Sequence, residues 1–257
     1  MSSLFVIFVF LLGGLWGSFA NVCIYRLPQN KKGLINGRSY CPKCKKKIFW
    51  HDNIPIISYF ILRGKCRNCK KSISSQYLIV ESLNIISFIT IYYLFGISLT
   101  TIFLMILFLS FLIIFFIDLK HYIIPDVLTF PLMALGFLKS FDPNIDPMFP
   151  NYINSLIGGL FGYGIIWLII IFYKQIRKKE GMGLGDAKLL AVIGFWFGWV
   201  SIPFIIFLSS TIALIIVIPD LLKKSKKLSS QIPFGPYIII ATIMFIVFKD
   251  KFLNLFL

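Results

Sequence analysis

Long apolar stretches alternate with short polar ones along the chain, and this pattern predicts a membrane protein. A helix crosses the hydrocarbon core of a bilayer when it is apolar over about 18 residues or more. We therefore expect an all-α polytopic membrane protein with about eight transmembrane helices. The fourth and sixth stretches are short or interrupted, so their bounds are approximate. The eight expected spans are 3–24, 77–95, 99–117, 124–140, 152–173, 184–200, 202–219 and 233–256.

Composition supports this fold class, because 58% of the residues are hydrophobic and the mean hydropathy is +0.87. The first stretch lacks a basic start and a small-residue cleavage site, so we interpret it as a retained span and not as a signal peptide. The expected organisation is a first span at 1–25, a polar cysteine module at 26–76, and a seven-span membrane body at 77–257.

The formal charge of +16 is distributed unevenly, and 13 of the Lys and Arg residues lie in 26–76 alone. Basic residues concentrate in cytoplasmic loops of membrane proteins. We therefore place the N-terminus outside and the loops 26–76, 118–123, 174–183 and 220–232 inside. The charge then indicates topology and attraction to anionic lipid. We expect no nucleic-acid partner, since no stacking or basic-helix module accompanies the charge.

Two C-x-x-C pairs, Cys41/Cys44 and Cys66/Cys69, are separated by 21 residues in the polar module. This spacing predicts a structural Zn²⁺ site with four thiolate ligands. Disulfides and a metal-free loop are the alternatives, and a reducing cytoplasmic location disfavours the first. Four thiolates leave no open position for a hydrolytic water, and the chain has no H-E-x-x-H motif, so we do not expect a metalloprotease. His51 is expected at the surface.

Two acids stand at the edges of apolar stretches: Asp118 ends the third and Asp186 opens the sixth. The third and sixth spans cross in opposite senses, so both acids are expected near the inner face. Two carboxylates in close contact do not both ionise easily. One can then take a proton from water while the other hydrogen-bonds a substrate carbonyl. The pattern is consistent with an aspartic protease.

Simpler roles remain open for the same acids. Asp186 follows Gly183 and Gly185, with Gly181 nearby. This glycine loop could adopt φ > 0 or let a peptide come close. The simpler role of Asp186 is that of an acid that caps the helix after the loop. Asp118 can instead pair with a basic side chain. Asp126 is the main rival partner, although its position after a proline suits a helix cap. Small residues at Gly13, Gly14, Gly17 and Ser18, and at Gly158, Gly159, Gly162 and Gly164, favour close helix packing.

Several motifs in order resemble the type IV prepilin peptidase family, and the resemblance covers nearly the whole chain. Asp118 lies eight residues before Asp126, as at the first catalytic position of that family. The other matching motifs are Gly17-Ser18-Phe19-Ala20-Asn21-Val22 with Tyr25-Arg26-Leu27-Pro28, the two C-x-x-C pairs, Asp52-Asn53-Ile54-Pro55 with Ser58-Tyr59, Gly183-Leu184-Gly185-Asp186 with Lys188-Leu189-Leu190, and Pro233-Phe234-Gly235-Pro236.

The resemblance implies a G-x-G-D aspartyl protease in the bacterial cytoplasmic membrane, with Asp118 and Asp186 catalytic and Gly183 and Gly185 in the active-site loop. It implies type IV prepilins and pseudopilins as substrates, cleaved after a glycine. It also implies N-methylation of the new N-terminus with S-adenosylmethionine as methyl donor, and the intact cysteine module favours this bifunctional branch.

The methyl-transfer site is not visible in the sequence, because no strand–G-x-G-x-x-G–helix unit is present. Glu81, Asp52 and Asn53 are weak candidates for it. Two other functions remain open: a peptidase without methyl transfer, and a membrane transporter or assembly scaffold with a zinc module. A transporter usually carries its ionisable residues near the midplane, on related halves, and neither feature is evident here. The sequence does not indicate an oligomeric state.

Overall fold

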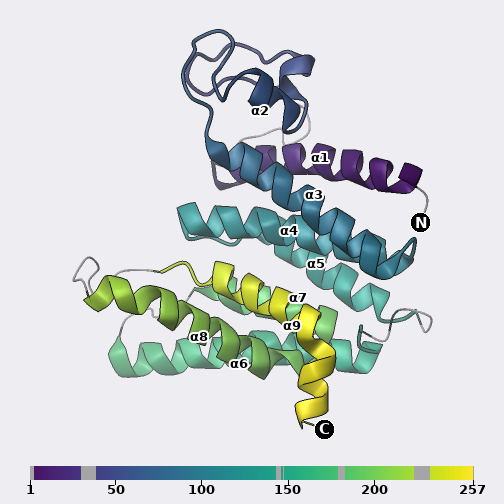
Figure 1. Cartoon of the computed structure of the whole chain (residues 1–257). Helices are drawn as coiled ribbons and strands as arrows, with labels where there is room; N and C mark the ends of the chain where they lie inside the picture. The colour runs from purple at the N-terminus through teal and green to yellow at the C-terminus, as the bar shows by residue number, and fades with distance from the viewer. Residues whose placement is uncertain are drawn as a thin grey trace. The chain divides into compact units, whose positions relative to one another are not determined.

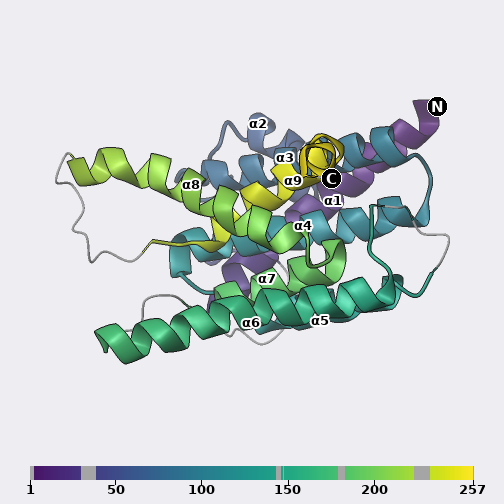
Figure 2. The same cartoon turned by 90° about the horizontal axis from the view of Figure 1, so that it is seen from below.

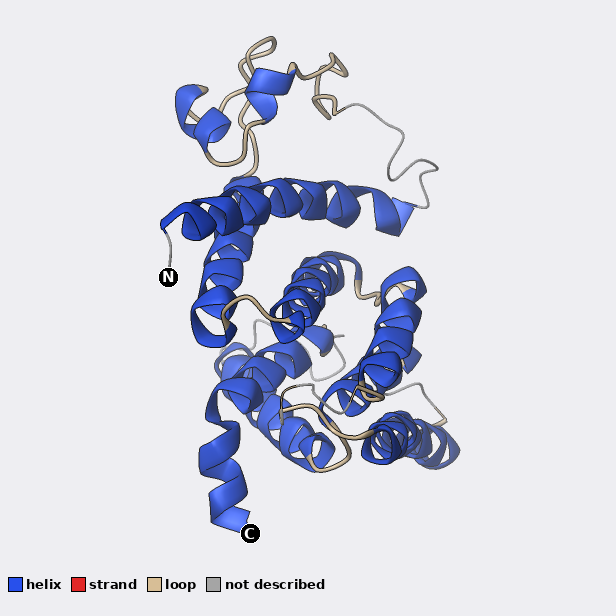
Figure 3. Cartoon of the chain, turned by 90° about the vertical axis from the view of Figure 1, so that its right-hand side faces the viewer, coloured by secondary structure: helices blue, strands red, loops and turns tan. Residues whose placement is uncertain are grey.

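Helices are the only continuous secondary-structure elements in the described residues (Figure 3). The described residues are 3–29, 39–142, 146, 148–178, 183–222 and 232–256. The computed structural model divides into two compact units, Met1–Ile113 and Ile114–Leu257. Residues 223–231 of the expected inner loop 220–232, and Gly181, lie outside the described residues.

Each of the eight apolar stretches contains one helix (Figure 1). Helix ends follow local chemistry: the side chain of Ser74 caps α3, that of Asn151 caps α6, and Gly96 and Gly198 end α3 and α7. The helices are α1 Ser3–Arg26, α2 Ile57–Ile61, α3 Ser75–Phe95, α4 Leu99–His121, α5 Asp126–Lys139, α6 Tyr152–Arg177, α7 Leu184–Phe197, α8 Ser201–Leu222 and α9 Gly235–Phe256, with 3-10 turns at Leu27–Gln29 and Trp50–Asn53.

The expected count of eight spans is not confirmed, because five helices in the described residues are long and apolar enough to cross a bilayer. Helices α5 and α7 have only 14 residues each. At about 1.5 Å per residue each reaches roughly 21 Å, short of the ~30 Å hydrocarbon core. Pro125 and Gly198 explain these limits, since the proline precedes α5 and the glycine ends α7 with φ +80°. The five candidate spans among the described residues are α1, α3, α4, α6 and α8.

In the first unit, α1 and α3 pack side by side (Figure 1). Glycines of α1 lie at their contact. A methyl group added to Gly17 would lie 2.9 Å from Cα of Glu81, and one added to Gly13 would lie 3.0 Å from Cα of Ile85. The Asn84 amide donates a 2.7 Å hydrogen bond to the carbonyl of Gly13. These contacts confirm that the glycines of the first stretch serve close helix packing.

In the second unit, α7 is the buried central helix, and α5 and α6 lie against it (Figure 2). Gly158 and Gly162 of α6 face Gly194 and Leu190 of α7, and added methyl groups would collide with backbone atoms there. Gly164, by contrast, faces open space. Helix α9 packs on α7 and α8. Gly158 and Gly162 are therefore needed for the close contact of α6 with α7, whereas Gly164 is not.

Substituting Gly158 with alanine should destabilise the second unit. The new methyl group would collide with the carbonyl of Gly194, and backbone atoms at a helix crossing cannot move aside. Overpacking of this kind costs about 1–3 kcal/mol. Thermal unfolding in detergent should show a lower midpoint for Gly158→Ala than for the wild type. Gly164→Ala is the matched control on the same helix, and an equal midpoint for the two variants would contradict the packing account.

Candidate active site and metal centre

Asp118 lies in the last turn of α4, where its side chain is buried, with a residue exposure of 4%. Its Oδ2 atom accepts a 3.0 Å hydrogen bond from the backbone N–H of Gly235. Gly235 is the first residue of α9, and the N–H groups of a helix's first turn have no partner within their own helix. The Asp118 carboxylate therefore occupies the N-terminal end of α9, where a negative charge is favoured.

Asp186 lies in the first turn of α7 and is 9% exposed. Its backbone N–H donates a 3.1 Å hydrogen bond to the carbonyl of Gly183. Gly183 has φ −82°, and Gly185 is not among the residues with positive φ. The expectation of φ > 0 in this loop is therefore wrong for both glycines. Gly185 lies instead at a tight contact, since an added methyl group would lie 3.1 Å from Cβ of Ile124.

The structure brings Asp118 and Asp186 together within the second unit, and the charge of Asp118 acts on the Asp186 carboxyl group. Ile124 packs against both Gly185 and Gly235, so the chain segments that carry the two acids share one neighbour. No ion pair joins either acid to another described residue. Two buried carboxylates without a cation are costly unless they hold a proton between them.

Asp126, the rival partner, has a different environment. It begins α5, half of its side chain is exposed, and its Oδ1 atom lies 2.6 Å from Nζ of Lys188. The ion pair joins the start of α5 to α7, and the Lys188 ammonium also lies over the Phe130 ring at 5.4 Å. Asp126 is thus a helix-start acid with a salt bridge, as its position after a proline suggested.

The four cysteines of the polar module form one cluster, with all four sulfur atoms within 4.8 Å of one another. Four thiolates at about 2.3 Å from a central Zn²⁺ would have sulfur–sulfur separations of about 3.8 Å, and Cys41 and Cys69 are 3.9 Å apart. The donor set and its dimensions fit a tetrahedral metal site. His51 is not part of the cluster.

The two C-x-x-C pairs adopt the same turn. The N–H of Cys41 donates to the Lys46 carbonyl and that of Lys45 to the Cys41 carbonyl; Cys66, Lys70 and Lys71 repeat this pattern. Lys45 and Lys70, each directly after the second cysteine of its pair, have φ of 58° and 55°. Each turn is closed by an isolated β-bridge, Tyr40 with Lys47 and Lys65 with Ser72. The repeated geometry aims two thiols from each turn at a common centre.

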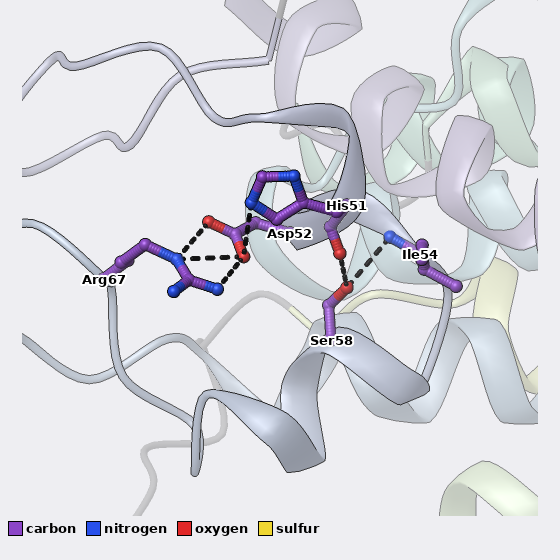
Figure 4. Close-up of polar contacts among 5 residues, drawn as sticks. All are labelled: His51, Asp52, Ile54, Ser58 and Arg67. Carbon is purple, nitrogen blue, oxygen red and sulfur yellow. Dashed lines mark hydrogen bonds and ion pairs between the residues drawn. The ribbon is translucent and has the colours of Figure 1, made fainter.

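Asp52 and Arg67 tie the connecting segment to the second turn (Figure 4). The Arg67 guanidinium donates to both carboxylate oxygens of Asp52, with Nη2 2.6 Å from Oδ1 and Nε 2.8 Å from Oδ2. These hydrogen bonds lower the pKa of the Asp52 carboxyl group. Ser58 accepts from the N–H of Ile54 and donates to the carbonyl of His51. Asp52 thus has a structural partner, and its neighbour Asn53 is exposed.

Removal of the metal should unfold the cysteine module. The binding free energy at a structural zinc site contributes directly to the folding free energy, with apparent values of about 10–16 kcal/mol in zinc-finger peptides at pH 7. We expect purified Cys41→Ser to lose nearly all its bound zinc, measured by atomic emission, and to gain protease cleavage sites between 39 and 74. Cys23→Ala is the control, because Cys23 is a buried residue of α1 outside the cluster. Equal zinc content in the two variants would contradict the site.

Sequence reasoning found the acids and the cysteines but missed the backbone donor. Gly235 was noted as part of a motif, without a role. The signal in the sequence was Gly235 itself, which lies between Pro233 and Pro236 at the start of an apolar stretch. The N–H of a first-turn residue has no partner within its own helix, so it can donate to a group elsewhere in the fold.

Fold and site together define a multi-pass membrane protein with a buried pair of carboxylates and a four-cysteine centre. Residues 11–95 match the model of the bacterial peptidase A24 N-terminal domain, and residues 102–218 match the model of the type IV leader peptidase family. No solved structure matches the chain.

Curated relatives named "Prepilin leader peptidase/N-methyltransferase" match over most of their length. The protein from Pseudomonas aeruginosa is 34% identical across 98% of this chain and 93% of its own. Those from Neisseria gonorrhoeae and Xanthomonas campestris are 35% and 36% identical, across 88% and 90% of this chain and 84% and 86% of their own. The chain belongs to the type IV leader peptidase family. It is an enzyme, a peptidase with methyltransferase activity.

Proposed function

We propose that this protein removes the leader from type IV prepilins and pseudopilins by cleaving after a glycine, and then N-methylates the new N-terminal residue. The observation that carries the proteolytic half is the buried pair Asp118 and Asp186, with the Gly235 N–H donating to Asp118. The names of the relatives support the substrate class and the methyl transfer.

The two acids have unequal surroundings, which supports unequal roles. A hydrogen bond from a backbone N–H at a helix start favours the ionised form of Asp118. Asp186, close to that charge and almost fully buried, keeps the shared proton. Asp118 is then the general base and Asp186 the general acid.

The reaction follows from these roles. Asp118 takes a proton from a water molecule, whose oxygen bonds to the scissile carbonyl carbon, while Asp186 gives its proton to the carbonyl oxygen. When the carbon–nitrogen bond breaks, the nitrogen takes the proton held by Asp118. The carbonyl re-forms and its hydroxyl proton returns to Asp186. The scissile segment must be extended, since a helix holds its carbonyls in hydrogen bonds, and Gly183 lies exposed beside Asp186 to receive it.

The membrane arrangement that suits this reaction has eight membrane-embedded helices, the N-terminus outside, and the cysteine module and active site at the cytoplasmic face of the bacterial inner membrane. The domain bounds proposed are 1–25, 26–76 and 77–257. Short α5 and α7 would then not reach across the bilayer, and water would have access to their ends. The zinc centre is structural, and anionic lipid is the partner of the basic loops.

S-adenosylmethionine would supply an electrophilic methyl group for the second reaction. The methyl transfer and the cleavage are tested together by incubating the purified protein with a prepilin in detergent, with and without this donor. Intact-mass spectrometry should show the mature protein in both samples and one additional methyl group only with the donor. Uncleaved prepilin in both samples would contradict the proposal, and a mature product without the methyl group would leave only the peptidase.

A further inference from the structure

Three polar side chains are buried between α1 and α3, inside two helices that can span the membrane. Asn84 is 0%, Asn21 4% and Glu81 8% exposed. Polar and charged groups are expensive at such positions and are retained when they have a partner or a task. The peptidase mechanism uses none of the three.

In these three side chains, the groups that lack a hydrogen-bond partner among the described residues are all acceptors. Asn21 donates to the carbonyl of Tyr77 at 3.1 Å and Asn84 donates to that of Gly13 at 2.7 Å. The carbonyl oxygens of both amides are buried and have no hydrogen-bond partner among the described residues. One oxygen of Glu81 accepts from the N–H of Ile56 at 2.7 Å, and no described residue binds its other oxygen. The cluster therefore lacks donors.

Helical register places these acceptors along one seam. Glu81 and Asn84 are three residues apart on α3, and residues so spaced share a helix face. Gly17 of α1 lies against both of them, since an added methyl group would be 2.9 Å from Cα of Glu81 and 3.3 Å from Cβ of Asn84. Asn21 is one turn further along α1, beside Tyr77, which is one turn before Glu81.

The Glu81 carboxylate holds a strained turn at Ile56. Ile56 has φ 61° and ψ −54°, which is rare for a β-branched residue, and the N–H of Ile57 bonds to the Pro55 carbonyl at 2.6 Å. Strain of this kind persists where the surroundings fix it and is common at functional sites. The bond from the Ile56 N–H to Glu81 is the contact that fixes it here.

We propose that Glu81, Asn21 and Asn84 form a binding site for a primary ammonium group. An ammonium brings N–H donors and a positive charge, which suit a seam whose unpaired groups are all acceptors and include a carboxylate. Within the proposed function, on which this inference rests, two reactants carry such a group: the new N-terminus of the cleaved substrate and the amino-acid part of S-adenosylmethionine.

The source of the ammonium decides what Glu81 does. If the substrate's N-terminus binds, Glu81 takes a proton from it. The nitrogen then bonds to the donor's methyl carbon, the carbon–sulfur bond breaks with its electron pair going to sulfur, and the nitrogen loses a second proton to water. If the donor's ammonium binds, Glu81 holds it without taking a proton and is a positioning residue.

Direct binding to the full-length protein in lipid nanodiscs tests the site without measuring turnover. One arm compares a short peptide beginning with phenylalanine against its N-acetylated form. The other compares S-adenosylmethionine against an analogue without the amino group. In the wild type, the ligand with the ammonium should bind at least about tenfold more tightly in one arm, and Glu81→Gln should remove that difference. The arm that responds identifies the source.

Glu81→Gln keeps the size of the side chain and an oxygen for the Ile56 N–H, so its thermal unfolding and zinc content should match the wild type. Should it unfold, Glu81→Asp, which keeps the charge, should bind the ammonium ligand more weakly than the wild type. Ser87→Ala is the matched control on α3, since its hydroxyl bonds only to the Asn84 backbone carbonyl.

Two failures are distinguishable. If folded Glu81→Gln binds all four ligands as the wild type does, the ammonium site is wrong, and the two asparagines are satisfied by buried water. If the wild type neither cleaves nor methylates a prepilin, the proposed function is wrong, whatever the binding arms show.

Discussion

Asp118→Asn and Asp186→Asn should each reduce cleavage of a prepilin by about 10⁴-fold or more, the size of loss seen when a catalytic aspartate becomes asparagine elsewhere. An amide neither takes a proton from water nor gives one to the scissile carbonyl. The fold should persist, because asparagine has almost the same shape and still accepts the hydrogen bond from Gly235. Single-turnover cleavage in detergent, followed by intact-mass spectrometry, gives the rates.

Asp126→Asn is the matched control for these variants. Asp126 is another acid of the same unit, but it is half exposed and paired with Lys188. We expect its loss to weaken one salt bridge, worth about 0–1 kcal/mol at an exposed position, and to leave cleavage within a few-fold of the wild type. Cleavage at the wild-type rate by a pure, folded Asp186→Asn preparation would rule out the carboxylate pair.

Gly235→Ala should also be severely impaired, although glycine to alanine usually stabilises a helix. The added methyl group would lie 2.7 Å from Oδ2 of Asp118 and 3.2 Å from Cδ1 of Ile124. Real methyl carbons do not approach an oxygen so closely, so the carboxylate must move away from its backbone donor. A displacement of about 1 Å at a catalytic group can cost around 10²-fold in rate. The same single-turnover assay measures the effect.

The unfolding midpoint separates a loss of geometry from a loss of fold. We expect Gly235→Ala to remain folded at the assay temperature while cleaving slowly. Gly164→Ala is the control, because a methyl group added there meets nothing within 4 Å. If Gly235→Ala and Gly164→Ala cleave equally fast, the hydrogen bond to Asp118 has no part in catalysis.

Much of the fold could be predicted from the sequence because a single property, apolarity over about 18 residues, determines where membrane helices form. All eight stretches became helices, and the packing role of Gly13, Gly17, Gly158 and Gly162 was predicted from their spacing. The lengths of the individual helices were predicted less well. A run such as 184–200 is apolar beyond Gly198, but that glycine ends the helix.

The candidate site was predictable where side chains carry the chemistry and unpredictable where the backbone does. The cysteines signal their cluster by spacing. Nothing in a linear pattern shows that the N–H of Gly235 reaches Asp118 across 117 positions, or that Glu81 holds the turn at Ile56. Lys139, near the end of the expected span 124–140, is a similar case, because it is buried, with its ammonium 3.1 Å from the Trp196 carbonyl and over the Phe149 ring.

The proposal that Asp118 and Asp186 act as one unit is tested most directly by combining their substitutions. Residues that share a proton are not independent, so the double variant Asp118→Asn/Asp186→Asn should cleave no more slowly than the slower single variant. The measurement is the single-turnover rate of all four proteins, above the rate without enzyme. Losses that multiply in the double variant would contradict the account, because they would show two acids working separately.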